Sequence, residues 1–168
     1  MILRAAKTAL VFGVALYSTL VVFNNLSDSD SNYQFIRHVL MMDSTFPGNR
    51  AMWRALHNPA WHAAFYWTIV LSEAAIAALC WYGGFHLAKS VNKDARQFRA
   101  AKQLAVAGLT LGLLLWLIAF LTIGGEWFLM WQSVTWNGQE TAFHMFAVFG
   151  IVLLLLLQPE PEVHTGAR

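Results

Sequence analysis

Long apolar stretches separated by polar loops dominate the pattern along the chain. The apolar runs cover about residues 8–23, 63–87, 104–131 and 142–157. A helix that crosses a bilayer needs about 20 predominantly apolar residues, with a range of roughly 17–25. The pattern therefore predicts an all-α fold, a bundle of four transmembrane helices formed as one domain by residues 1–158. The first and last runs are short, so we expect them to include polar flanking residues.

The first run has one feature of a signal peptide, because Arg4 and Lys7 precede it. A signal peptide also ends in a small-x-small cleavage site. The run ends instead in Val-Val-Phe-Asn-Asn at residues 21–25. We therefore predict that this helix is retained as the first span.

A long outer loop, residues 24–62, joins the first two runs and is predicted to contain short interfacial helices. Asp30 or Ser31 can cap the first of them. Its apolar positions gather on one face: Ile36, Val39 and Leu40. Such a face suits a helix that lies either on the membrane surface or on top of the bundle.

The rest of this loop is predicted to turn and then form a second short helix. Residues 43–49, Asp-Ser-Thr-Phe-Pro-Gly-Asn, have the composition of a turn. Residues 50–57 follow as the second helix, and Pro59 is suited to the first position of the second span.

Composition supports a membrane protein. The chain has 168 residues, of which 58% are apolar and 12% charged, whereas soluble domains carry about 25% charged residues. The lipid bilayer is therefore the expected partner of this surface. The net charge of +2 is too small to indicate nucleic-acid binding. The single cysteine, Cys80, excludes an intrachain disulfide and a Cys-based metal motif.

The distribution of basic residues predicts the orientation. Eight lie at one end of the expected bundle: Arg4, Lys7, Lys89, Lys93, Arg96, Arg99, Lys102 and Arg168. Three lie at the other end: Arg37, Arg50 and Arg54. Basic loops stay in the cytoplasm, so we expect a multi-pass protein of the bacterial inner (cytoplasmic) membrane with both termini cytoplasmic. Residues 159–168 are expected to form a flexible cytoplasmic tail.

Small residues recur at helical spacing in the second and third runs. Close approach of helices in lipid depends on such residues. One stripe contains Val70, Glu73, Ala77, Cys80 and Gly84, and the other contains Ala105, Gly108, Gly112, Leu115, Ala119, Thr122 and Glu126. These faces are predicted to pack against each other or against a partner.

Two acidic residues lie inside predicted spans, Glu73 near the middle of the second and Glu126 in the outer part of the third. A charge at mid-bilayer costs at least about 2.5–3.5 kcal/mol. Each carboxyl could therefore serve a proton relay, an ion or substrate site, or a redox contact. Alternatively, each is a hydrogen-bonded group that sets helix register.

Histidines accompany Glu126 at the outer end. His144 lies at a similar depth and could pair with it, while His62 and His57 lie at the same face. No two of these residues have the i, i+3 or i, i+4 spacing of a local ligand pair. We therefore predict neither a metal site nor a cofactor, and we interpret these histidines as hydrogen-bonding residues at the interface.

Long, unusual strings lie at the outer end of the chain. They are Phe-Asn-Asn-Leu at 23–26, Asp-Ser-Thr-Phe-Pro-Gly-Asn at 43–49 with Met-Trp-Arg-Ala at 52–55, and Gly-Gly-Glu-Trp-Phe-Leu-Met-Trp-Gln-Ser at 124–133 with Trp-Asn-Gly-Gln at 136–139. Through them the chain resembles an uncharacterised bacterial family of predicted small integral membrane proteins, over almost its whole length to residue 158. The resemblance implies four helices and an inner membrane, but no activity.

These strings also contain further candidate functional residues: Arg54, Trp131 and Asn137, besides Asn24. Loop residues often carry function. The same side chains could instead satisfy backbone groups of a loop that folds down as a lid. The sequence leaves both interpretations open.

No motif names a reaction, so we expect a protein that is not an enzyme. The packing stripes favour an accessory or assembly subunit that docks to a larger membrane complex, or a homo-oligomer. One alternative is a small transporter or small-molecule binder that uses Glu73 and Glu126. Another is a redox protein with an outer-face haem or quinone site.

Overall fold

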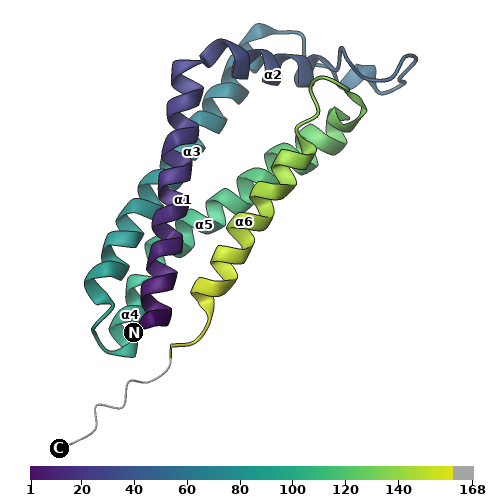
Figure 1. The fold of residues 1–168 in the computed structure, drawn as a ribbon. Helices are drawn as coiled ribbons and strands as arrows, with labels where there is room; N and C mark the ends of the chain where they lie inside the picture. Colours follow the sequence, from purple (N-terminus) through teal and green to yellow (C-terminus); the bar gives the residue numbers. More distant parts are fainter. Residues whose placement is uncertain (161–168) are drawn as a thin grey trace, which may run out of the picture.

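The computed structural model describes residues 1–160, and within them every regular element is helical (Figure 1). Four helices are long and apolar enough to cross a membrane. They are α1 (Ile2–Ser27), α3 (Pro59–Ser90), α5 (Gln103–Leu114) continued by η2 (Leu115–Trp127), and α6 (Gln139–Leu157). The predicted all-α architecture with four spans is confirmed.

The helix ends differ from the apolar runs. α1 has 26 residues and α6 has 19, so neither is short, because both include polar flanking residues. At the start of α3, the Asn58 side chain accepts a hydrogen bond from the Ala60 N–H, and Pro59 is the first helical residue, as predicted. The third span ends at Trp127 rather than residue 131, because Leu129 has a left-handed backbone with a φ of 54°.

The outer loop folds onto the end of the bundle. Its main helix, α2 (Ser29–Met41), is capped by Asp28, not by Asp30 or Ser31, because the Asp28 carboxylate accepts from the Ser31 N–H at 3.5 Å. The apolar face of α2 is buried, with Val39 and Leu40 in one cluster with Phe128 and Met130. Of the two predicted positions, α2 therefore takes the one on top of the bundle.

Three shorter elements complete the fold. The second helix of the outer loop is only η1 (Met52–Arg54), shorter than predicted, and η3 (Met130–Gln132) follows the third span. At the opposite end, α4 (Ala95–Ala101) joins α3 to α5. α1 and α6 lie closest at the end near α4 and diverge toward α2 (Figure 1).

Glycines allow close contact among the spans. A Cβ atom at Gly83 would collide with the backbone of Ala105, and one at Gly108 would lie 2.9 Å from the Cys80 sulfur. One at Gly112 would collide with the ring of Phe149 in α6. The predicted contact between the stripes of the second and third spans is thus confirmed, and the third span also packs its glycines on α6.

The third span changes helix type midway. From Leu115 the backbone is π-helical, with a hydrogen bond from the Phe128 N–H to the Ile123 carbonyl five residues earlier. A π-helix advances more residues per turn than an α-helix. The stripe predicted with α-helical spacing therefore rotates away, and Thr122 and Glu126 are exposed.

The end of the described chain is tied to the bundle, although residues 159–168 were expected to be a flexible tail. The Glu160 carboxylate is buried and lies 2.6 Å from both the Lys7 and the Lys102 Nζ atoms, and 3.4 Å from the Arg4 Nε atom. A buried carboxylate is retained where cations compensate it. Glu160 is therefore held by these ion pairs, and residues 161–168 lie outside the described residues.

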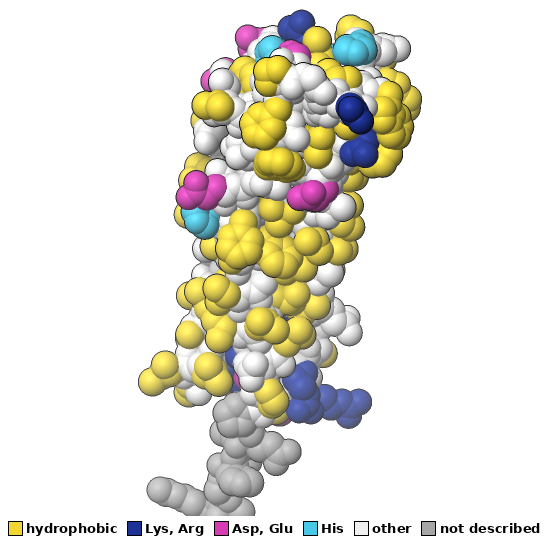
Figure 2. Space-filling model, turned by 90° about the vertical axis from the view of Figure 1, so that its right-hand side faces the viewer, with side chains coloured by type: hydrophobic (Ala, Val, Ile, Leu, Met, Phe, Trp, Pro, Cys, Tyr) yellow, Lys and Arg dark blue, Asp and Glu magenta, His cyan; other side chains and the backbone are white. Residues whose placement is uncertain are grey.

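The surface agrees with a membrane environment. Figure 2 shows a face on which hydrophobic side chains cover much of the length between the two ends, with Lys and Arg side chains near both ends. Exposed Leu, Ile and Phe side chains on the spans contribute to such a surface: Leu16, Leu20, Leu71, Phe85, Ile118, Ile151 and Leu154. Lipid contact removes the cost of exposing them to water.

The glycine contacts predict a selective effect of one added methyl group. Gly83→Ala should lower the free energy of unfolding in detergent micelles by about 1–3 kcal/mol, because the Ala105 backbone cannot move without separating α3 from α5. Gly13→Ala is the matched control, since a Cβ atom there meets nothing within 4 Å. Equal unfolding curves for the two variants would contradict the packing described.

The Glu160 contacts predict an acid-induced release of the chain end. Burial alone raises the pKa of Glu160, but hydrogen bonds from Lys102 and Lys7 outweigh burial and hold this pKa below its usual 4.5. The stabilisation is therefore complete above pH 4.5 and is lost as the pH falls through the lowered value.

Electron paramagnetic resonance can measure this release. A spin label at Pro159→Cys, an exposed position, should be immobile at pH 7 and at pH 4.5, and mobile at lower pH. The same label should be mobile at every pH when Glu160→Gln is added. Release above pH 5, or no effect of Glu160→Gln, would argue against the ion cluster.

Candidate functional site

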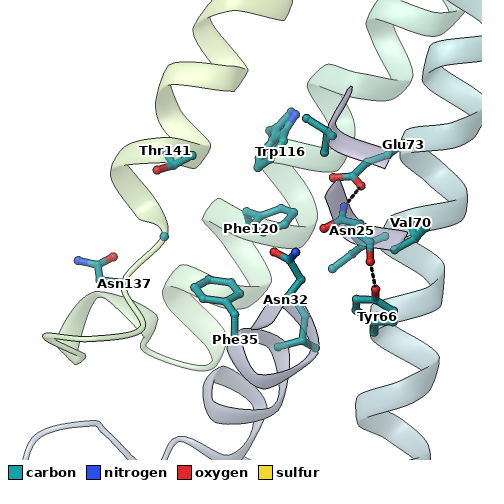
Figure 3. Close-up of a pocket in the computed structure, with 14 residues that line it drawn as sticks. Asn25, Asn32, Phe35, Tyr66, Val70, Glu73, Trp116, Phe120, Asn137 and Thr141 are labelled. Atoms are coloured by element: carbon teal, nitrogen blue, oxygen red, sulfur yellow. Dashed lines mark hydrogen bonds between the residues drawn. The ribbon is translucent and has the colours of Figure 1, made fainter. Parts of the chain in front are cut away.

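A cavity of about 320 Å³ lies in the half of the bundle nearest α2 (Figure 3). Its walls come from α1, α2, α3, η2 and the start of α6. The lining residues are Val21, Asn25, Asn32, Phe35, Ile36, Tyr66, Ile69, Val70, Glu73, Trp116, Phe120, Asn137, Gly138 and Thr141. This volume is at the lower end of the range for small-molecule sites.

Glu73 carries the only carboxyl group in the cavity wall, and the residue is 5% exposed. The Asn25 side-chain amide donates a hydrogen bond of 2.5 Å to the Oε2 atom of Glu73. The Tyr66 hydroxyl donates a bond of 2.6 Å to the backbone carbonyl of Asn25. These bonds link α1 to α3 and fix the orientation of the carboxyl group, which Figure 3 shows beside the cavity.

The opposite wall is aromatic. Trp116 and Phe120 project from η2 with ring centroids 4.5 Å apart, and Phe35 comes from α2 (Figure 3). Thr141 and Asn137 lie farther across the cavity, at the start of α6 and just before it. A molecule in the cavity would thus meet flat apolar surface between two polar walls.

The polarity of the lining defines the chemistry that the cavity can recognise. No Lys, Arg or His lines it. A carboxyl group accepts hydrogen bonds when ionised, and side-chain amides both donate and accept. The site therefore suits a ligand with an apolar body and a donor group. Within residues 1–160, no group of three or more His, Cys, Asp or Glu side chains is arranged to hold a metal ion.

The predicted site residues do not all lie together. Glu73 and Asn137 line the cavity, and the Asn137 side chain also accepts from the Gln139 N–H. Glu126 and His144 are exposed and form no hydrogen bond or ion pair with each other in the described part of the chain. The π-helix explains this, because it turns Glu126 away from the face that α-helical spacing predicts.

The remaining predicted residues hold the loops at the outer end. The buried His62 donates from Nε2 to the Leu56 carbonyl at 2.7 Å. Arg54 donates to the Trp127 carbonyl at 3.3 Å and lies 4.8 Å from the centroid of the Trp127 ring. These two side chains satisfy backbone groups, the second of the two interpretations left open for Arg54.

Trp131 acts differently, through an edge-to-face contact with Phe46 at 5.7 Å. Beside it, Gln132 joins the two outer loops, because its Oε1 atom accepts from the Phe46 N–H at 3.1 Å and the Asn49 amide at 3.2 Å. Ser44 adds a bond of 2.8 Å to Ser133. The loops thus form one roof above the cavity end of the bundle.

Several cavity residues were not singled out from the sequence: Asn25, Asn32, Tyr66, Trp116, Phe120 and Thr141. Asn25 offered a signal, because it is an amide at the end of an apolar run, where a polar side chain needs a partner. Asn32 and Thr141 offered none, since both lie in polar segments where such residues are common.

The fold and the cavity define a multi-pass α-helical membrane protein with an amphipathic site. A family model described as predicted small integral membrane protein (DUF2165), a domain of unknown function, matches residues 3–159. The chain belongs to this family, which confirms the resemblance found in the sequence. Comparisons with curated proteins and with solved structures give no significant match.

Proposed function

We propose that this integral membrane protein binds a small lipophilic molecule in the cavity beside Glu73. The observation that supports this proposal best is the Glu73–Asn25 pair at the wall of an open, largely apolar cavity. A carboxyl group within a span is expensive in lipid and is commonly functional. Here the pair leaves the carboxyl group beside free volume, whereas a purely structural role requires none.

The chemistry of the walls defines the ligand class. Trp116 and Phe120 offer stacking surface to an aromatic or flat apolar body. Glu73 accepts a hydrogen bond from a hydroxyl or amine group at one end, and Thr141 can bond a polar group at the other. Thr141, which lines the cavity at the start of α6, is exposed, so a ligand can reach the cavity from outside the bundle at this rim.

The other functions expected from the sequence have less support. The small-residue stripes favoured an accessory subunit, but their glycines are used in contacts among α1, α3, α5 and α6 of the same chain. A transporter that uses both acids requires Glu126 near Glu73, yet Glu126 does not line the cavity. Binding at Glu73 alone is the version that the geometry supports.

The location is part of the proposal. The end of the bundle with α4 carries Lys89, Lys93, Arg96 and Arg99 in exposed positions. By the positive-inside rule this end faces the cytoplasm of a bacterium, with the protein in its inner membrane. The N-terminus lies at this end as well, and the cavity then opens in the periplasmic half of the bilayer (Figure 1).

Substitutions on the two polar walls should remove the ligand. We expect mass spectrometry of extracts from the chain purified in lipid nanodiscs to reveal a compound absent from empty nanodiscs. Glu73→Gln and Thr141→Trp should each reduce its amount about tenfold or more, the first by replacing a carboxyl oxygen that accepts the ligand's hydrogen bond and the second by filling the exposed rim.

Glu126→Gln is the matched control, because it makes the same chemical change at an exposed carboxyl outside the cavity, and the compound should be retained. No compound above the empty nanodisc, or full retention by both cavity variants, would refute the proposal.

Cysteine labelling tests the orientation. Cys80 is buried, so a single added cysteine dominates the reaction with a membrane-impermeant maleimide. In intact spheroplasts Ser29→Cys should react and Asn92→Cys should not, whereas both should react after the membrane is permeabilised. The reverse pattern would place α4 outside.

A further inference from the structure

A second polar cluster lies at the other end of the bundle, far from the cavity. Arg4 and Lys7 of α1 and Lys102, just before α5, are each less than a tenth exposed and converge on Glu160. Phe98 lies beneath them, with its ring centroid 5.0 Å from the Arg4 guanidinium carbon and 5.7 Å from the Lys102 nitrogen. We call these three cations the basic cradle.

The basic cradle has more positive than negative charge within residues 1–160. Three cations face one carboxylate, and the Arg4 Nη2 atom is buried without a hydrogen-bond partner. The other Arg4 nitrogen, Nη1, donates to the Val91 and Lys93 carbonyls, and both lysines donate to the Gln158 carbonyl. Neutral carbonyls satisfy hydrogen bonds but do not compensate charge, so the cradle favours a further anion.

A groove lies beside the basic cradle and shares Lys102 with it. It is a cavity of about 280 Å³ between the start of α5 and the end of α6, next to Lys102. Arg99 and Lys102 line one part of it, and Val106 and Leu157 line the part along the spans. Gln103 and the chain-end residues Gln158 and Pro159 complete the lining. Arg99 is exposed and forms no ion pair with a described residue. Positive charge at the interface beside an apolar wall matches the two ends of a phospholipid.

We propose that this groove binds an anionic phospholipid of the leaflet at the α4 end, with the lipid phosphate between Arg99 and Lys102. The acyl chains extend along Val106 and Leu157 toward the bilayer centre. Glu160 competes with the phosphate for Lys102, because its carboxylate already lies 2.6 Å from the Lys102 nitrogen. The Glu160 carboxylate thus weakens lipid binding.

Native mass spectrometry of the full chain in detergent tests this site. Dioleoylphosphatidylglycerol is the anionic probe, and dioleoylphosphatidylcholine is the zwitterionic reference. Each cation near a membrane surface contributes about 1 kcal/mol, which is about a fivefold change in affinity. We expect tighter binding of the anionic lipid, about fivefold weaker binding in Arg99→Gln and Lys102→Gln, and about fivefold tighter binding in Glu160→Gln.

Arg96→Gln is the matched control, since it removes the same charge from an exposed position in α4 that does not line the groove, and binding should be unchanged. The gain expected for Glu160→Gln cannot result from misfolding, so it keeps the test valid if Lys102→Gln fails to fold.

Three outcomes would overturn the proposal. They are equal binding of the two lipids by the unsubstituted chain, loss of binding in Arg96→Gln equal to that in Arg99→Gln, and no gain in Glu160→Gln. Displacement of the anionic lipid by millimolar inorganic phosphate would assign the groove to a soluble anion instead.

Discussion

Close contact between helix backbones at one end of the bundle determines the arrangement of everything else. Gly83 lets α3 touch the backbone of Ala105, and Gly84 lets the Phe12 ring of α1 approach the same region. Lipid supplies no hydrophobic drive for helices to associate, so packing at small residues must supply it. The spans are therefore held tightly near α4, while bulkier residues such as Trp116 and Phe120 occupy the space between them toward α2. The cavity lies where α1 and α6 diverge.

The change from α- to π-helix at Leu115 sets which side chains the third span offers to this cavity. Trp116, at the start of the π-helix, lies in the cavity wall, and Glu126, near its end, lies on the outside. One consequence is that a single acid, Glu73, gives the site its polarity. Another is that the roof must be fixed separately, through Gln132 and the contacts of Arg54 with Trp127.

Apolar runs, caps and small residues predicted much of this fold. The four spans were predictable from the length of the apolar runs, and the start of α3 from the fixed backbone of Pro59. The contact at Gly108 was predictable from helical spacing. Each of these features depends on local properties of the sequence. The π-helix was not predictable, because hydrophobic periodicity is interpreted with the same number of residues per turn along the whole helix. The Glu73–Asn25 and Lys7–Glu160 pairs were missed for another reason. They join residues far apart in the chain, and the pattern around each partner was that of an ordinary helix end or polar tail.

The attachment of Glu160 to the first helix has a consequence for biosynthesis. A chain is made from its N-terminus, so Arg4 and Lys7 reach the membrane long before residue 160 has been translated. Until then Glu160 cannot pair with either cation. Glu160 follows the last span, so the buried ion pairs form only after that span has been made. The ion pairs thus form late, and they link the first helix to the segment that follows the last helix.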